Sequence, residues 1–372
     1  MEYNELTYAC AISSIFGSRC LEARRVAEHF LNPGELFSLS TRELQELFGT
    51  RGKIIEKISG REVLDKSAAE VEWCAANNIS ISYFKDNRFP KRLNESPDAP
   101  IILFHKGAID FNTSRFVSIV GTRKPTNYGL SMCKEIVSEL AKLNPQVVIV
   151  SGLAYGIDIC AHKSALEHHI PTIGVMATPI DTIYPSLHRQ YACNFLENGG
   201  ILTEFHKGEA TLPVNFLRRN RIIAGLSDAT VLIESKIQGG GMVTASIANS
   251  YSREVFALPG KITDPQSQGC NFIIGENMGR IITSAKDIAI GMGWYQDRGK
   301  KGKKVKFQEL LGQYDTIKQN ILLTLSADLT INTATLVEKS QFEPRRVLSA
   351  LTELEMDQII EKDIYGNYHI CI

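Results

Sequence analysis

The sequence lacks several features that mark other classes of protein. It has no Cys-X-X-Cys pair and no apolar run approaching the ~18 residues of a membrane span, and its start is not a charged segment before a long apolar one. We therefore expect neither secretion nor a membrane span. The eight cysteines are scattered, so we expect free thiols without bound metal, as suits a cytoplasmic protein.

An excess of charge of one sign is also missing. The 372 residues carry 41 basic and 41 acidic side chains, so the formal net charge is zero. A nucleic-acid site would therefore have to be a local patch and not the whole surface. With 44% apolar residues, the chain is long enough for two or three domains that each bury a core.

The N-terminal fifth of the chain, residues 1–75, is predicted to form short helices separated by glycine turns. Ser40 or Thr41 is a suitable N-cap for one of them. We interpret this segment as a small helical domain of helix-hairpin-helix or SAM-like type. Such helical pairs can grip nucleic-acid backbones, dock proteins or simply pack, and the pattern does not decide between these roles.

The central segment alternates apolar runs with amphipathic stretches from Arg115 onward. This alternation predicts an α/β domain, a Rossmann-like doubly wound and mostly parallel sheet, over residues 76–292. Residues 79–112 are interpreted as a connecting strand region that leads into it. A basic linker is predicted over 293–306, followed by a winged-helix-like domain over 307–372, with three helices and a hairpin.

Five loops follow predicted strands, and in an open parallel sheet such loops gather at the edge where ligands bind. Residues 121–124 combine a glycine, a hydroxyl and two cations before a helix, which favours phosphate binding. Residues 151–158 match neither G-X-G-X-X-G nor the Walker A pattern, which disfavours dinucleotides and ATP. Residues 239–241 are three glycines, typical of an anion nest.

Aromatic rings near these loops could stack on exposed bases, which is how single strands are held without sequence preference. The rings are those of Tyr128, Tyr155, Tyr184 and Phe205. Bracing of the sheet edge is an equally good interpretation of any one ring or arginine. The loops indicate one phosphate-reading crevice.

No coherent catalytic set accompanies the loops. The acids and histidines nearby are Asp158, Asp181, Glu204, Glu234, His162 and His188. Each can serve as a helix cap or an ion-pair partner, and we interpret His162 as a structural histidine. We therefore expect no catalytic residues, no enzymatic activity and no cofactor.

Seven motifs in order carry a resemblance to a known family. They are GTRKPTNYG, SGLAYGIDICAH, TIGVMATPIDTIYP, GGILTEF, FLRRNRIIAGLS, GGGMVTASIA and REVFALPG. With them the chain closely resembles the DNA-processing protein A (DprA, or Smf) family. The resemblance implies a cytoplasmic homodimer that binds single-stranded DNA and helps load the RecA recombinase during natural transformation, with no catalytic activity. It also implies the three-part layout predicted above.

The resemblance adds site residues by their positions in the motifs. Arg123 corresponds to the family's phosphate-binding arginine, and residues 219–221 correspond to its arginine-asparagine-arginine stretch. The DNA-binding residues predicted from the loops and the resemblance together are Gly121, Thr122, Arg123, Lys124, Ser151, Gly152, Tyr155, Gly156, Tyr184, His188, Arg189, Arg219, Asn220, Arg221, Gly240 and Gly241.

The sequence departs from the family pattern at three places. The second loop of the family usually reads SGLARGID, whereas position 155 here is tyrosine, so a ring replaces a cation. Glycines 239–241 replace a usual serine-glycine-serine, and Leu217 replaces a proline. These differences affect the details of backbone contact.

Two other function classes remain as alternatives. Nucleotide phosphoribohydrolases share this type of fold, but their PGGXGTXXE string is absent. A pure protein-interaction module would show no affinity for oligonucleotides. In the winged domain, the helix TATLVEKSQ carries one lysine and one glutamate and is a poor phosphate clamp, so we expect that domain to contact protein.

Overall fold

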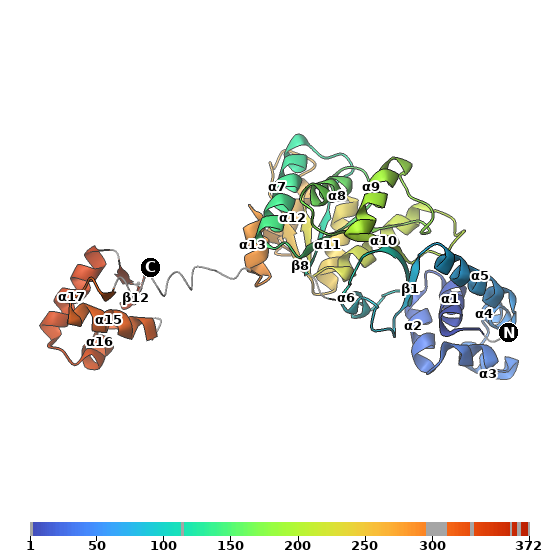
Figure 1. Cartoon of the computed structure of the whole chain (residues 1–372), viewed down its shortest axis with the longest axis horizontal. Helices are drawn as coiled ribbons and strands as arrows, with labels where there is room; N and C mark the ends of the chain where they lie inside the picture. Colours follow the sequence, from blue (N-terminus) through green and yellow to red (C-terminus); the bar gives the residue numbers. More distant parts are fainter. Residues whose placement is uncertain are drawn as a thin grey trace. The chain divides into compact units, whose positions relative to one another are not determined.

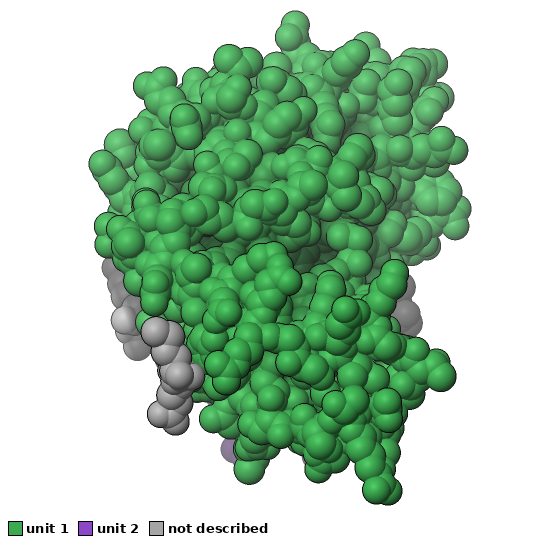
Figure 2. All heavy atoms as spheres, turned by 90° about the vertical axis from the view of Figure 1, so that its right-hand side faces the viewer, with its two compact units in different colours: residues 1–295 green, residues 296–372 purple. Residues whose placement is uncertain are grey.

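The computed structural model describes residues 3–112, 115–294, 311–327, 331–357, 359–362 and 366–370. These residues form two compact units, 1–295 and 296–372, which are described separately (Figures 1 and 2). The predicted basic linker 293–306 lies almost entirely outside the described residues. This division does not separate residues 1–75 from the α/β segment, so the boundary at 75/76 stays a prediction.

The first unit begins with helices joined by short turns. Ser40 caps one of them, as predicted, through a capping box with Glu43. Cores of these helices and of the sheet merge into one cluster of buried side chains. The elements are α1 (Glu5–Phe16), α2 (Cys20–His29), η1 (Pro33–Ser38), α3 (Thr41–Phe48), α4 (Gly52–Ser59) and α5 (Glu62–Ala76).

A nine-stranded sheet follows, in the order β1-β2-β6-β5-β4-β3-β7-β8-β9. Strands β3 to β9 pair in parallel, whereas β1 pairs with β2 and β2 with β6 in antiparallel fashion. The predicted connecting region 79–112 therefore extends the sheet by two strands. The strands are β1 (Ser80–Tyr83), β2 (Ile102–Gly107), β3 (Arg115–Val120), β4 (Val147–Gly152), β5 (Thr172–Val175), β6 (Gly199–Thr203), β7 (Ala229–Leu232), β8 (Glu254–Ala257) and β9 (Arg280–Ile281).

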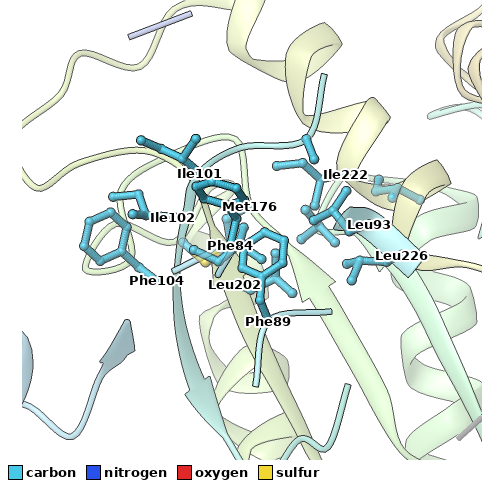
Figure 3. Packing of buried hydrophobic residues seen from close by; sticks show 14 of the residues in the cluster. Phe84, Phe89, Leu93, Ile101, Ile102, Phe104, Met176, Leu202, Ile222 and Leu226 are labelled. Atoms are coloured by element: carbon cyan, nitrogen blue, oxygen red, sulfur yellow. The ribbon is translucent and has the colours of Figure 1, made fainter. Parts of the chain in front are cut away.

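Both faces of this sheet are covered, because apolar side chains alternate to both sides of each strand. On β3, Val117 and Ile119 belong to one buried cluster, whereas Phe116 and Val120 belong to the other. Figure 3 shows part of the cluster that contains Phe116 and Val120. In it, Leu202 lies among residues of β2, α6 (Lys91–Asn94) and α10 (Pro213–Leu226). The remaining elements are α7 (Asn127–Leu143), α8 (Ile157–Glu167), η2 (Ser186–His188), α9 (Arg189–Asn194), η3 (Phe195–Glu197), α10 (Pro213–Leu226), α11 (Gly240–Ser250), α12 (Gln268–Gly275) and α13 (Ala285–Gly291).

The strand order reverses at β3. From β3 the chain proceeds outward through β4, β5 and β6, then returns to the other side of β3 with β7, β8 and β9. Such a reversal leaves a crevice at the carboxyl ends of the two strands where it occurs. The fold thus confirms a doubly wound sheet and places the expected ligand site between β3 and β7.

The described residues of the second unit form three helices and a three-stranded antiparallel sheet, in the order β10-β12-β11. The chain order, helix, strand, two helices and a two-stranded hairpin, is that of a winged helix. The last helix before the hairpin is α17, so α17 and not α16 holds the place of a recognition helix. The elements are α15 (Thr316–Ala327), β10 (Ile331–Asn332), α16 (Thr333–Ser340), α17 (Pro344–Met356), β11 (Ile360–Lys362) and β12 (Asn367–Ile370).

Candidate nucleic-acid interface

A crevice of about 470 Å³ lies at the reversal of the strand order. Its walls come from the loops after β3, β4 and β7 and from one side of α10. Three cations, Arg123, Arg219 and Lys236, line it against a single carboxylate, Asp158. The lining residues are Val120, Gly121, Thr122, Arg123, Ala154, Asp158, Phe216, Leu217, Arg219, Asn220, Ile223, Ser235, Lys236, Gln238, Gly239, Gly240, Gly241 and Thr244.

The loop after β3 presents an exposed arginine to this crevice. Arg123 is solvent-exposed, and its guanidinium lies 5.5 Å from the centre of the Phe216 ring. Within the described residues it forms no ion pair. Lys124 beside it is also exposed but is absent from the lining of the crevice. Arg123 is thus available to an anion.

The helix that follows this loop does not offer the phosphate cradle that its sequence suggests. Glu234, which is 1% exposed, lies at the N-terminus of α7 and accepts hydrogen bonds from the backbone N–H of Thr126 at 2.9 Å and from its hydroxyl at 2.5 Å. A Cβ on Gly129 would collide with the same carboxylate. The protein's own acid therefore fills this helix terminus.

The loop after β7 supplies the open backbone amides instead. Helix α11 begins at Gly240, and no acceptor in the described part of the chain takes the N–H of Gly240 or Gly241. A Cβ on Gly240 would meet open space, whereas one on Gly241 would lie 3.2 Å from Cα of Gly121. Free amides at a helix N-terminus are the groups that commonly bind anions, and Lys236 lies in the same wall.

The loop after β4 shapes the floor rather than the rim. Ser151 is buried and donates to the carbonyl of Ile119 at 2.6 Å. A Cβ on Gly152 would collide with the guanidinium of Arg219, and Gly156 has φ of +82° and faces the carbonyl of Thr122. These predicted site residues lie under or beside the crevice and serve its geometry.

Arg219 is 4% exposed and donates to the carbonyl of Val175 at 2.5 Å. Burial lowers its pKa, while Asp158 opposes this. The pKa of Asp158 is in turn raised by burial, an effect that the positive charge of Arg219 opposes. Asn220 lies in the same wall. Arg219 therefore contributes positive potential from beneath the surface.

Arg221 lies outside the crevice lining, on the other side of α10. It pairs with Glu204, donates to the carbonyl of Asp98 at 2.5 Å, and contacts the sulfur of Cys20 at 3.1 Å. Burial alone would lower its pKa, but Glu204 and Cys20 hold the pKa above its usual value. The structure does not bring Arg221 together with the other predicted site residues. Its charge is already matched by Glu204.

The loop after β5 lies beside the crevice and contributes rings. The rings of Tyr184 and Phe216 lie 5.5 Å apart, so Arg123, Phe216 and Tyr184 form a continuous row. Tyr155 packs edge-on against His188 at 5.1 Å, and Nδ1 of His188 lies 2.7 Å from the carbonyl of Leu153.

Exposure separates the predicted stacking rings and cations of this rim. Tyr184 is 54% exposed and Tyr155 45%, and Arg189 is also exposed but does not line the crevice. Phe205, by contrast, is buried and cannot stack on a base.

Sequence reasoning missed Phe216 and Lys236. Lys236 stands directly after a predicted strand, in the stretch ESKIQGGG, which was the available signal. Phe216 gives no such signal, because only the turn of α10 aims its ring at Arg123.

His162, on α8, does not line the crevice. His162 is fully buried, with Nε2 2.7 Å from the carbonyl of Gly152 and Nδ1 2.7 Å from the hydroxyl of Thr172. Burial lowers its pKa to about 4.

Within the described ranges, no three His, Cys, Asp or Glu side chains are grouped to hold a metal ion. In the same ranges, no helix has the length and apolar character to cross a bilayer.

Comparisons with known proteins identify relatives of this chain. The family model for DNA recombination-mediator protein A matches residues 80–293. The chain is 32% identical to protein Smf of Synechocystis over 370 residues, covering 97% of this chain and 92% of that one. It is 36% identical to DNA processing protein DprA of Streptococcus pneumoniae over 203 residues, covering 55% of this chain and 71% of that protein.

Two solved structures share the fold. The X-ray structure of DprA from Streptococcus pneumoniae has a TM-score of 0.66 at 29% identity, covering 78% of this chain and 98% of that chain. DNA processing protein A from Helicobacter pylori, whose structure is described for its single-stranded DNA binding mode, has a TM-score of 0.52 at 30% identity and covers 57% and 95%. The matched motifs, the fold and the near full-length relative place this chain in the DNA recombination-mediator protein A family.

Proposed function

We propose that this protein binds single-stranded DNA in the crevice between β3 and β7 and acts as a recombination mediator. The carrying observation is that one crevice is lined by Arg123, which is exposed, and by the N–H groups of Gly240 and Gly241, none of which has a partner in the described part of the chain. These groups recognise phosphates, whatever the base sequence of the strand. The Phe216 and Tyr184 rings offer stacking that tolerates every base.

The wider role extends this proposal. The protein protects exposed or incoming single strands in the cytoplasm, acts as a homodimer and helps load RecA, without catalysing a reaction. Family membership and the similarity to a protein with a described single-stranded DNA binding mode support this role. Two crevices in a dimer would hold one strand with multiplied affinity through effective concentration.

The test is a titration of a fluorescent single-stranded oligonucleotide at several salt concentrations, with duplex as competitor. Arg123→Ala removes a charged hydrogen-bond donor without exposing a buried partner, so we expect an affinity loss of roughly 10- to 100-fold. The slope of log affinity against log salt should fall by about 0.7 for the lost phosphate contact.

Arg88→Ala is the matched control, because Arg88 is also exposed but does not line the crevice. It should bind as the wild type does. Equal affinities of the wild type and Arg123→Ala would locate the site elsewhere. A wild type that binds no oligonucleotide would overturn the proposal and make hydrolysis of nucleoside monophosphates the next activity to assay.

A further inference from the structure

The N-terminal helices contain an internal repeat that the crevice leaves unexplained. Phe16-Gly17-Ser18-Arg19 joins α1 to α2, and Phe48-Gly49-Thr50-Arg51 joins α3 to α4. We call these two turns the twin hairpins.

Their backbones are nearly identical. Gly17 has φ 54° and ψ −117°, and Gly49 has φ 59° and ψ −129°. Each glycine N–H donates at 2.8 Å to the carbonyl four residues earlier. The arginines that follow match too, with φ and ψ of −89° and 59° for Arg19 and −79° and 59° for Arg51. The repeat is therefore structural as well as sequential.

The twin hairpins face each other. The rings of Phe16 and Phe48 lie 6.1 Å apart, and both are buried. Glu22 joins the two sides, because its carboxylate lies 2.5 Å from the guanidinium of Arg51 and 3.5 Å from that of Arg19. One acid thus serves two arginines, which leaves one positive charge in excess at the centre of the surface.

Three clefts of about 430, 610 and 690 Å³ surround this centre. Their walls are strongly basic, with only Glu22 and Asp98 as carboxylates. Lys53 and Lys57 are exposed and have no acidic partner within the described residues. The cations of the three clefts are Arg19, Arg25, Arg51, Lys53, Lys57 and Arg218, besides Arg221, whose charge is matched by Glu204.

This basic surface is continuous with the crevice. Leu217 on α10 lines both the crevice and the largest cleft, and that cleft shares Arg19, Glu22 and Arg25 with its two neighbours. All of these residues belong to the first compact unit. In Figure 2 this unit forms one unbroken mass with a hollow on the face that is shown. A strand that leaves the crevice at Leu217 therefore meets a cleft in which cations outnumber the carboxylates of Glu22 and Asp98.

The composition of the clefts indicates which part of the strand they contact. A Cβ on Gly17, Gly49 or Gly52 would meet nothing within 4 Å, so the turn backbones stand open to a close approach. The rings of the hairpins, Phe16 and Phe48, are buried in the core and cannot stack on bases. Arginine and lysine side chains recognise phosphates and ignore sequence.

We propose that the twin hairpins and their basic clefts form a second DNA site, which holds the phosphodiester backbone of the same single strand that occupies the crevice. The inference rests on the proposed function of the crevice and adds to it a path for the strand. The crevice stacks bases and grips a phosphate, whereas the hairpins hold the continuing backbone by charge.

The experiment measures binding of oligothymidylates of about 6, 12 and 24 bases to the full-length protein, a series that spans the usual site sizes for single strands. Lys53→Ala/Lys57→Ala removes two cations that have no acidic partner within the described residues, so the substitutions leave no carboxylate unpaired. The shortest oligonucleotide fills the crevice alone, so its affinity should not change. With the longest one, affinity should fall roughly 5- to 10-fold, and the salt slope should fall by about 1.4 for two phosphates.

Arg88→Ala/Lys142→Ala is the charge-matched control, since both residues are exposed and line none of these clefts. It should reproduce the wild type at every length. If Lys53→Ala/Lys57→Ala keeps the wild-type gain in affinity and salt slope with length, the second site does not exist. If the variant loses affinity only for duplex, the occupant is wrong. If the shortest oligonucleotide fails to bind even the wild type, the crevice proposal itself has failed.

Discussion

Two arginines that lie against opposite sides of helix α10 are in opposite environments. On the crevice side, Phe216 lies under the exposed guanidinium of Arg123, which no carboxylate neutralises within the described residues. On the other side, Arg221 is buried against Glu204 and the carbonyl of Asp98. The comparison teaches that an arginine can serve a ligand where the fold leaves it unmatched, and serves the fold where it meets an acid.

The largest effect should come from the side of α10 on which Arg221 pairs with Glu204. Arg221→Ala leaves the buried carboxylate of Glu204 without its partner, which costs about 3–5 kcal/mol of the free energy of unfolding. Urea unfolding measures this loss. Arg221→Met/Glu204→Leu should recover most of it, because a volume-matched apolar pair removes both charges.

DNA affinity per folded molecule should survive in the Arg221→Met/Glu204→Leu protein. A stable double variant that had lost single-strand binding would assign Arg221 to the DNA site after all. The two sides of α10 would then not differ as the structure indicates.

Sequence patterns could predict much of this architecture for a physical reason. Apolar runs such as residues 116–120 alternate with amphipathic helices, and that period fixes a parallel sheet covered on both faces. The glycine-rich loops could be placed at one edge, since parallel strands end together. The roles of residues 79–107 could not, because antiparallel edge strands depend on pairing across distant segments.

The partners of individual side chains were harder to predict. Arg221 and Arg219 are two positions apart and look equivalent in sequence, but only the long-range approach of Glu204 on the β6 side separates them. Likewise, nothing local shows that Glu234 fills the N-terminus of α7. The electrostatic role of a side chain depends on which residue, distant in sequence, the fold places beside it. Secondary structure depends on residues that are close in sequence.

A second prediction concerns the floor of the crevice and pH. The neutral ring of His162 is buried, and its pKa is lowered to about 4 by burial. The unfolded chain therefore binds a proton that the folded one does not, from about pH 6.5 downward, so stability falls as the pH falls through this window. Between pH 7 and pH 5 this group alone should remove about 2 kcal/mol of the free energy of unfolding.

His162→Gln tests the assignment, since an amide keeps hydrogen bonding without a titrating group. Urea unfolding at pH 7 and pH 5 should show a smaller loss in the variant by that amount. His105, whose pKa burial and Arg88 also lower to about 4, is present in both proteins and cancels in the difference. Equal pH dependence in the two proteins would mean that the ring binds protons equally in the folded and unfolded states, so that folding does not lower its pKa.

The smallest effect should come from the rim of the crevice, where a substitution can add one more exposed cation. Tyr155 is 45% exposed, so Tyr155→Arg places a cation in the second loop, beside the crevice, without opening a cavity. One added phosphate contact should raise single-strand affinity about threefold and steepen the salt slope by about 0.7. Tyr155→Leu removes the ring without adding charge and separates stacking from electrostatics. If Tyr155→Arg binds more weakly and Tyr155→Leu equally so, the ring itself holds a base, and at this position stacking contributes more than charge.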